Sequence, residues 1–257
     1  MFSKKVMIGI AFAGILGFSL PATAAVSILR SFAGGAGDGQ APTGSLCISG
    51  STVYGMTTAG GASALGTIFR MNTDGSGYSV LHSFGGAGDG STPWGSLILS
   101  GSTVYGMTYY GGSAADPAAG GTVFRMNTNG TGYGILHNFD GALGGGTNPY
   151  GSLCLAGSTL YGTTSAGYNP QGGANNSGTV FRINTDGTGF SDLHAFPVAD
   201  SITNATDGEN PNSTLALSGS TLYGATTNGG AFGHGTIFRM DTTGSGFSLV
   251  HHFAGGV

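Results

Sequence analysis

One motif occurs four times in this chain, and this repetition restricts the possible folds more than any other feature. Gly-Thr-(Ile/Val)-Phe-Arg begins at Gly66, Gly121, Gly178 and Gly235, so one unit is about 55 residues long. Each copy is preceded by a proline and a Tyr-Gly pair, and is followed by a segment like Leu-His-x-Phe. Similar units in tandem form the same small supersecondary structure and bury their apolar faces against their neighbours.

Each unit predicts four short antiparallel strands. In the second unit the strands are expected at residues 95–101, 102–108, 121–127 and 132–139. Asn-Thr-Asn-Gly at 127–130 is a strong hairpin signal, because Asn and Gly tolerate a positive φ. After residue 25 no segment shows a sustained helical period.

Four antiparallel strands in a unit of about 50 residues are typical of a propeller blade. We therefore expect an all-β fold, a β-propeller-like array of four four-stranded repeats that forms a ring or part of one. The repeats are expected at about residues 33–84, 85–139, 140–196 and 197–253. A β-solenoid is the competing architecture, but its strands pair with the next coil, whereas the hairpin turns here lie within each unit.

The first residues differ from the repeats and predict a signal peptide over residues 1–24. Lys4 and Lys5 precede an apolar run at residues 6–20, and the small residues Ala22 and Ala24 follow it. This pattern predicts cleavage after Ala24, or after Ala25. An uncleaved membrane anchor is disfavoured because the apolar run is shorter than the roughly 20 residues that a span needs. Residues 25–257 are then expected to be a secreted or cell-surface domain without a membrane span.

The repeat units resemble a known bacterial family. Leu-His-x-Phe, a Gly/Asp-rich turn, proline, a Leu-containing strand, Tyr-Gly-x-Thr, Gly-Gly and Gly-Thr-Val-Phe-Arg follow one another in this order. The series is similar to the GloVer tandem repeat of choice-of-anchor tandem repeat proteins, over roughly residues 26–257. The resemblance implies an exported bacterial protein with a propeller-like β architecture. The members of this family are named for differing C-terminal anchoring segments. In this chain we expect no anchor-like pattern after Phe253.

Charge and motifs exclude several classes of function. Without residues 1–24 the chain has five Arg, no Lys and eleven acidic residues, a formal charge of −6, so a basic nucleic-acid-binding footprint is absent. The sequence contains no Gly-x-Ser-x-Gly, His-Glu-x-x-His or Gly-x-x-x-x-Gly-Lys motif. We therefore expect a non-enzymatic binding or structural module with no catalytic residue, metal or cofactor. An extracellular carbohydrate-active lyase or hydrolase is the alternative, because an Asp pair would leave no mark in the sequence.

Arg and His recur once in each unit and an Asp turn recurs in three of the four, with Gly145 in the third, and we expect these residues to build the blades. They are Arg70, Arg125, Arg182 and Arg239, then His82, His137, His194 and His251, and the turn residues Asp38, Asp89 and Asp207. An arginine ring for an anionic ligand is the alternative for the first set. A metal or acid–base role is the alternative for the histidines, and calcium for the Asp-Gly turns.

The connection between the second and third strands varies most between units, and loops on a rigid frame often carry function. We expect the following residues of these connections to face a ligand: Tyr109, Tyr110, Tyr168, Asn169, Asn175 and Asn176. Aromatic and amide groups suit an extracellular glycan, and a cell-surface protein is the other partner considered.

The two ends of the repeat array suggest that it continues. Residues 26–32 resemble the fourth strand of a preceding unit, and the fourth unit supplies its own fourth strand at 246–253. One strand is therefore surplus. Either the chain is cut from a longer array, which we favour, or the surplus strand caps or dimerises an exposed edge, so that oligomers form through strand edges.

Overall fold

The computed structural model describes residues 7–9, 26–112, 120–139, 146–167, 177–197 and 206–255. The predicted cleavage residues Ala24 and Ala25 lie outside these ranges. Strand β1 (Met7–Gly9) pairs antiparallel with β2 (Val26–Ile28). No helix in the described ranges is long and apolar enough to cross a membrane.

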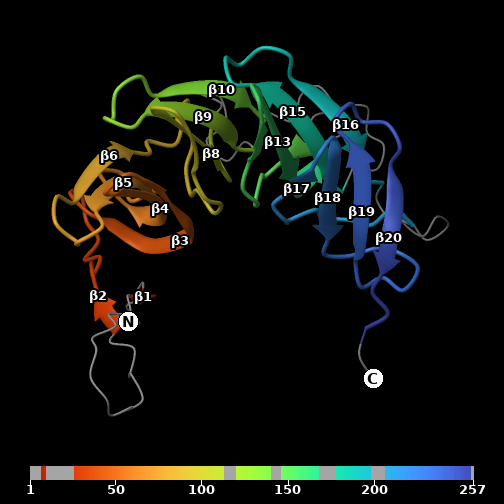
Figure 1. Cartoon of the computed structure of the whole chain (residues 1–257), viewed down its shortest axis with the longest axis horizontal. Coiled ribbons are helices and arrows are strands. Elements are labelled where there is room, and N and C mark those ends of the chain that lie inside the picture. The colour runs from red at the N-terminus through yellow and green to blue at the C-terminus, as the bar shows by residue number, and fades with distance from the viewer. Residues whose placement is uncertain are drawn as a thin grey trace, which may run out of the picture.

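The repeats form four sheets of four antiparallel strands, here called blades 1 to 4 (Figure 1). Blade 1 contains β3 (Gly39–Ser49), β4 (Thr52–Gly60), β5 (Thr67–Asn72) and β6 (Ser79–Ser83). Blade 2 contains β7 (Ile98–Ser100), β8 (Thr103–Thr108), β9 (Thr122–Asn127) and β10 (Gly134–Asn138). Blade 3 contains β12 (Cys154–Ala156), β13 (Thr159–Thr164), β15 (Thr179–Asn184) and β16 (Ser191–Ala195). Blade 4 contains β17 (Ala216–Ser218), β18 (Thr221–Thr226), β19 (Thr236–Asp241) and β20 (Ser248–His252), and the short strands β11 (Gly146–Thr147) and β14 (Ala166–Gly167) pair with each other.

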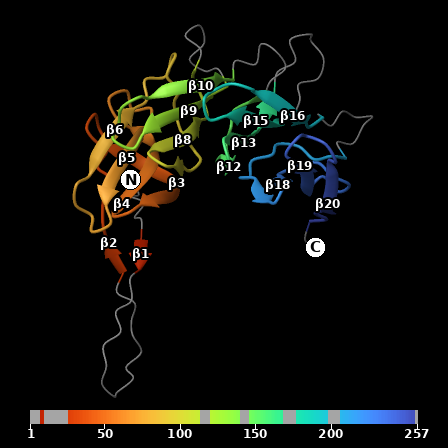
Figure 2. The same ribbon diagram turned by 45° about the horizontal axis from the view of Figure 1, so that its top comes forward.

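The blades follow one another along an open arc, with blade 1 and blade 4 at its two ends (Figures 1 and 2). Within each blade the strands pair in chain order. The predicted all-β array of four four-stranded, propeller-like repeats is thus confirmed, and the ring that these blades form is not closed.

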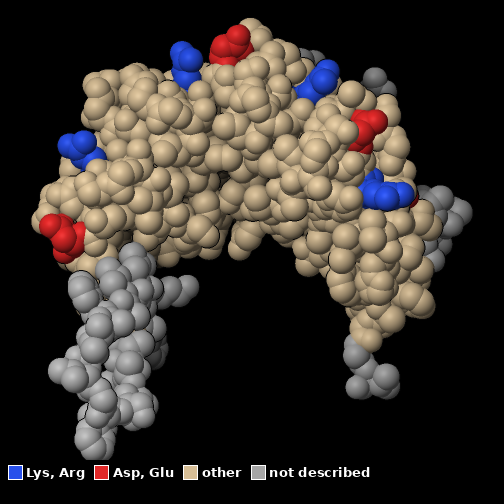
Figure 3. Space-filling view, in the orientation of Figure 1, with Lys and Arg blue, Asp and Glu red and all other residues tan. Residues whose placement is uncertain are grey.

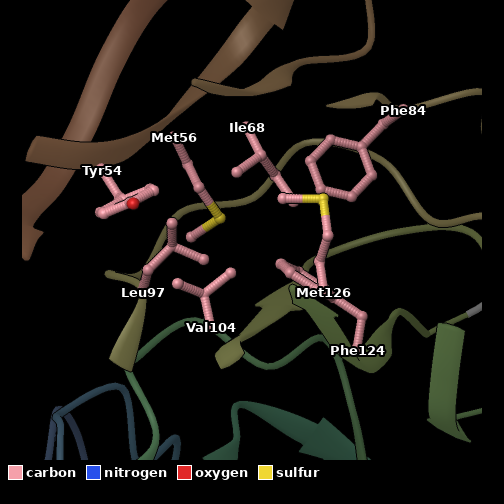
Figure 4. Close-up of a cluster of buried hydrophobic side chains, with 8 residues drawn as sticks. All are labelled: Tyr54, Met56, Ile68, Phe84, Leu97, Val104, Phe124 and Met126. Atoms are coloured by element: carbon pink, nitrogen blue, oxygen red, sulfur yellow. The ribbon is translucent and has the colours of Figure 1, made fainter. Parts of the chain in front are cut away.

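The hydrophobic cores lie between blades. In the first core, side chains of blade 1 face side chains of blade 2 (Figure 4). These residues are Tyr54, Met56, Ile68 and Phe84 on one side and Leu97, Val104, Phe124 and Met126 on the other. Two further cores repeat this arrangement between blades 2 and 3 and between blades 3 and 4. A blade therefore depends on its neighbour to exclude water from its apolar face.

In the third strand of an inner blade, residues on both faces of the strand are buried. Phe124 and Met126 of β9 are buried against blade 1, while Val123, on the opposite face of the strand, is buried against blade 3. An inner blade is covered on both faces, so period-two alternation distinguishes the two neighbours instead of core from solvent.

The repeated motif residues have packing roles within the blade. A Cβ atom at Gly106, the glycine of Tyr-Gly, would lie 2.5 Å from Cζ of Phe124, so only glycine lets this ring cross the strand. The threonines of Tyr-Gly-x-Thr and Gly-Thr-x-Phe meet as a buried hydroxyl pair, with Oγ1 of Thr108 and Oγ1 of Thr122 2.9 Å apart. The other three blades contain the same pair at 2.8–2.9 Å. Each buried hydroxyl thus has a hydrogen-bond partner.

The first strands are linked from blade to blade along the inner side of the arc. The backbone N–H of Ser45 donates to Oγ of Ser96 at 2.6 Å, and that of Ser96 donates to Oγ of Ser152 at 2.7 Å. The N–H of Ser152 donates in turn to Oγ1 of Thr214 at 3.0 Å. This series fixes the register of each blade against the next.

The fourth strands carry the recurrent histidines, which stack on an aromatic ring of the following blade. The ring centroids of His82 and Tyr133 are 3.8 Å apart, and those of His194 and Phe247 are 3.7 Å apart. His137 stacks on Phe190 in the same way. The expected bond to a neighbouring turn is present at His82, whose Nε2 lies 3.0 Å from the Asp89 carboxylate. These three histidines therefore join blades.

We expect His194 to make the stability of the protein depend on pH. Burial lowers the pKa of His194, and the Asp207 carboxylate, 3.7 Å from Nε2, offsets this only in part. The unfolded chain takes up the proton near pH 6.5, above the pKa of the folded state. The contribution of His194 is therefore complete above pH 6.5 and is lost as the pH falls below it.

Urea unfolding at pH 7.5 and pH 5 should show this loss. In H194F, which keeps a ring to stack on Phe247, the decrease between the two pH values should be smaller. An equal decrease in wild type and H194F would show that His194 is not responsible.

Candidate ligand-binding surface

Four aromatic side chains gather where blades 2 and 3 meet, and we call them the aromatic surface: Trp94, Tyr109, Tyr110 and Tyr150. The rings of Trp94 and Tyr150 stack, with centroids 5.5 Å apart and planes 18° apart. Tyr109 stands edge-on to both Tyr150, at 6.1 Å, and Tyr110, at 4.5 Å. The four rings thus form one continuous set built from two repeats.

The proline turn before each first strand positions two of these rings. The residue before the proline has a left-handed backbone in every blade, with φ of 55° at Ala41, 54° at Thr92, 59° at Asn148 and 54° at Asn210. Such residues normally stay extended, so this conformation is strained and must be held by its surroundings. The residue after the proline is Thr43, Trp94, Tyr150 or Asn212 in the four blades.

Hydrogen bonds from the preceding blade hold these turns. The N–H of Thr92 donates to the carbonyl of Leu65 at 2.8 Å, and the N–H of Asn148 donates to the carbonyl of Gly120 at 2.6 Å. Nδ2 of Asn148 also donates to the carbonyl of Tyr109 at 3.1 Å. The turn that carries Tyr150 is therefore bonded directly to the segment that carries Tyr109.

Tyr109 and Tyr110 directly follow strand β8, and their backbone is paired. The N–H of Tyr110 donates to the carbonyl of Ser91 at 3.2 Å, and the N–H of Ser91 donates back at 2.8 Å. The N–H of Tyr109 donates to the carbonyl of Thr92 at 3.2 Å. All four rings are thus attached to backbone that is fixed before any ligand arrives, which lowers the entropic cost of binding.

The aromatic surface is open to solvent. The exposed fractions are 37% for Trp94, 42% for Tyr110 and 41% for Tyr150. In blade 4 the equivalent post-proline position is Asn212, whose Nδ2 donates to Oγ1 of Thr227 at 3.1 Å. Oδ1 of Asn212 has no hydrogen-bond partner in the described part of the chain. Rings and an amide group therefore occupy corresponding sites on successive blades.

On the face shown in Figure 3, the Arg side chains of the described residues are spaced along the outer rim of the arc. Among the described residues, none of the four recurrent arginines forms an ion pair, and Nε of Arg239 donates to Oγ of Ser248 at 3.1 Å. This arrangement does not favour an arginine ring for an anionic ligand.

The carboxylate of the Asp89 turn is already bonded to groups of the protein. Asp89 accepts the N–H of Gly85 at 2.6 Å and lies against His82. Burial alone would raise the pKa of Asp89, but hydrogen bonds from His82 and Gly85 bring it below its usual value. Within the described ranges no three His, Cys, Asp or Glu side chains are grouped so that they could hold a metal ion.

The structure brings together two of the six residues predicted to face a ligand. Tyr109 and Tyr110 belong to the aromatic surface, whereas Tyr168, Asn169, Asn175 and Asn176 lie outside the described residues. Trp94 and Tyr150 were missed. The available signal was the variation at the residue after the proline, in a turn that is otherwise repeated.

Four similar antiparallel blades joined through their faces define a tandem-repeat protein of the propeller type. The chain belongs to the Gloeobacter/Verrucomicrobia repeat family, whose repeat matches residues 13–197. The resemblance to the GloVer repeat is thereby confirmed. Membership and fold together support a repeat-built binding or structural module.

Two solved structures show similarity to this chain, and the first of them supports the fold. A chain in the crystal structure of a nidogen/laminin complex has a TM-score of 0.52 and 17% identity, with 82% of this chain and 65% of that chain covered. This chain thus spans less than two thirds of the length of that relative. TolB from Acinetobacter baumannii has a TM-score of 0.48 and 15% identity, with 87% and 45% covered. No curated protein matches the sequence.

Proposed function

We propose that this protein is an exported, non-enzymatic binding module whose aromatic surface binds an uncharged glycan outside the cell. The observation that carries the proposal is the exposed, stacked pair of Trp94 and Tyr150, which Tyr109 and Tyr110 extend. The face of an aromatic ring is electron-rich and attracts the weakly positive C–H groups on the face of a sugar ring. Exposed, preorganised rings therefore suit a saccharide chain.

Polar groups near the rings fit the hydroxyl groups of a sugar. The exposed side chains of Tyr110 and Tyr150 carry phenol groups, which can donate and accept hydrogen bonds. Arg and Lys are the groups that recognise carboxylate or sulfate, and the aromatic surface contains neither. A neutral glycan is therefore favoured over an acidic one.

The composition of the aromatic surface supports binding without catalysis, and the start of the sequence supports export. A glycosidase usually needs two carboxyl groups about 5–10 Å apart, and the four residues of the aromatic surface supply none. Export is supported by the basic and apolar segment that ends at Ala24 or Ala25. The partner is accordingly an extracellular or cell-surface glycan.

Binding to an array of neutral oligosaccharides tests the proposal. The double variant W94A/Y150A should weaken binding at least about tenfold, since stacked rings contribute about 1 kcal/mol or more beyond their buried area. F232A is the matched control, because Phe232 is 60% exposed in blade 4 and makes no ring contact with the aromatic surface among the described residues. Binding that persists in W94A/Y150A, or product formation from a bound glycan, would contradict the proposal.

A further inference from the structure

The outer face of blade 4 exposes the residues that the other blades bury. This terminal face consists of Tyr223, Val250, His251 and Phe253. Phe253 is 41% exposed, whereas its equivalents Phe84, Phe139 and Phe196 are at most 2% exposed. Tyr223 is 36% exposed, against 5–7% for its equivalents in the other blades. Blade 4 lies at one end of the arc (Figure 1), and side chains whose equivalents pack between blades at three places are exposed here.

The three internal interfaces show what covers such a face. The ring of Phe196 meets that of Phe238 of the next blade at 5.3 Å with the planes 60° apart, and His194 stacks on Phe247. Leu193, the equivalent of Val250, lies 3.3 Å from the position of a Cβ atom on Gly244. The contacts at Phe84 and Phe139 repeat this geometry at 5.5 and 5.2 Å. A complementary face thus presents a phenylalanine, a second aromatic ring and a glycine turn.

Blade 1 has such a face, formed by Phe69, Gly75 and Tyr78. It is covered by residues 29–32 of the same chain. Phe32 meets Phe69 at 5.1 Å, and the Arg30 guanidinium lies 3.8 Å from the ring centre of Tyr78. These residues take the place of Leu-His-x-Phe, but unlike the equivalent segments in the other repeats they belong to no four-stranded sheet. This cover is therefore held by side chains and by the 2.9 Å ion pair of Arg30 with Asp38.

We propose that the terminal face of blade 4 docks on blade 1 of a second copy of this chain and displaces residues 29–32 there. His251 then stacks on Tyr78 of the second copy, and Phe253 meets its Phe69. The contact continues an interface that the chain already makes three times. It also extends the inner hydrogen-bond series, because the N–H of Thr214 comes to face Oγ of Ser45, which is exposed at the other end of that series.

A contact between two different surfaces of one chain is heterologous, and it closes into a ring or continues as a filament. The described residues of one chain form four blades, so two copies of them supply eight, which lies within the range of about four to eight that closed propellers use. We therefore expect a closed head-to-tail dimer.

Sedimentation velocity of the full chain over a range of concentrations tests this interface. The wild type should form a dimer. H251A/F253A should raise the dissociation constant of the dimer at least about tenfold, as removal of central aromatic residues does at other interfaces. F32A weakens the contact of residues 29–32 with blade 1, which competes with docking, and should therefore lower the dissociation constant of the dimer. The two variants thus have opposite effects, although Phe32 and Phe253 occupy equivalent positions in the repeat. Circular dichroism melts would show that each variant is folded.

The opposite signs of the two variants separate this interface from general association. A wild type and F32A that both stay monomeric would overturn the proposal. So would a dimer that H251A/F253A leaves unchanged, because its interface would lie elsewhere.

Discussion

F196A should lower the free energy of unfolding by about 3–5 kcal/mol, the usual cost of removing a buried phenylalanine. Phe196 is fully buried between blades 3 and 4, where its ring meets Phe238 and Phe247. Its truncation leaves a cavity that backbone on both sides holds open. Chemical denaturation followed by circular dichroism measures the difference.

F253A is the matched control for this prediction, because Phe253 is the same motif residue on the exposed terminal face. At concentrations where the chain is monomeric, F253A should change the free energy of unfolding by less than about 0.5 kcal/mol. Similar losses in F196A and F253A would mean that burial between blades does not determine the role of this residue.

The second large effect is expected at Gly95, on the inner side of the arc. A Cβ atom there would collide with the carbonyl group of Gly151 in the next blade. Backbone cannot turn away as a side chain can, so G95A should destabilise the protein by about 3 kcal/mol, the upper part of the range for overpacking.

The matched substitution for this test is G134A. Gly134 begins β10, its φ is not positive, and a Cβ atom there would meet nothing within 4 Å. G134A should therefore be neutral or stabilise by up to about 1 kcal/mol. If G95A unfolds at the same denaturant concentration as G134A, the blades do not approach each other as closely as described.

The blades could be predicted because their determinants are local. The Asn-Thr-Asn-Gly turn after β9 and the Tyr-Gly and Gly-Thr-Val-Phe segments fix a four-stranded sheet within one unit. Four repetitions of the pattern then made the propeller-like array predictable.

The contacts between blades could not be predicted in this way. Val123 reads as the solvent side of a strand, but it is buried because a second blade covers it. The partner of His82 is Tyr133, about 50 residues further along the chain. Trp94 and Tyr150 likewise come from different units and meet because both follow the proline turn. Sequence spacing within one unit holds no information on such pairs.

In the strained turn before each first strand, the backbone conformation is the same in all four blades while one exposed or partly exposed side chain varies. The left-handed residue and the proline set the direction of the chain in all four blades, whichever side chain comes next. That next position has accepted Thr43, Trp94, Tyr150 and Asn212 on the same frame. If the aromatic surface binds a glycan as proposed, a substitution at this position changes the binding surface without affecting a core residue, and duplication of a blade adds one more such position. Under that proposal, the ligand preference of such an array can change through one residue per repeat while the turn that holds it stays the same.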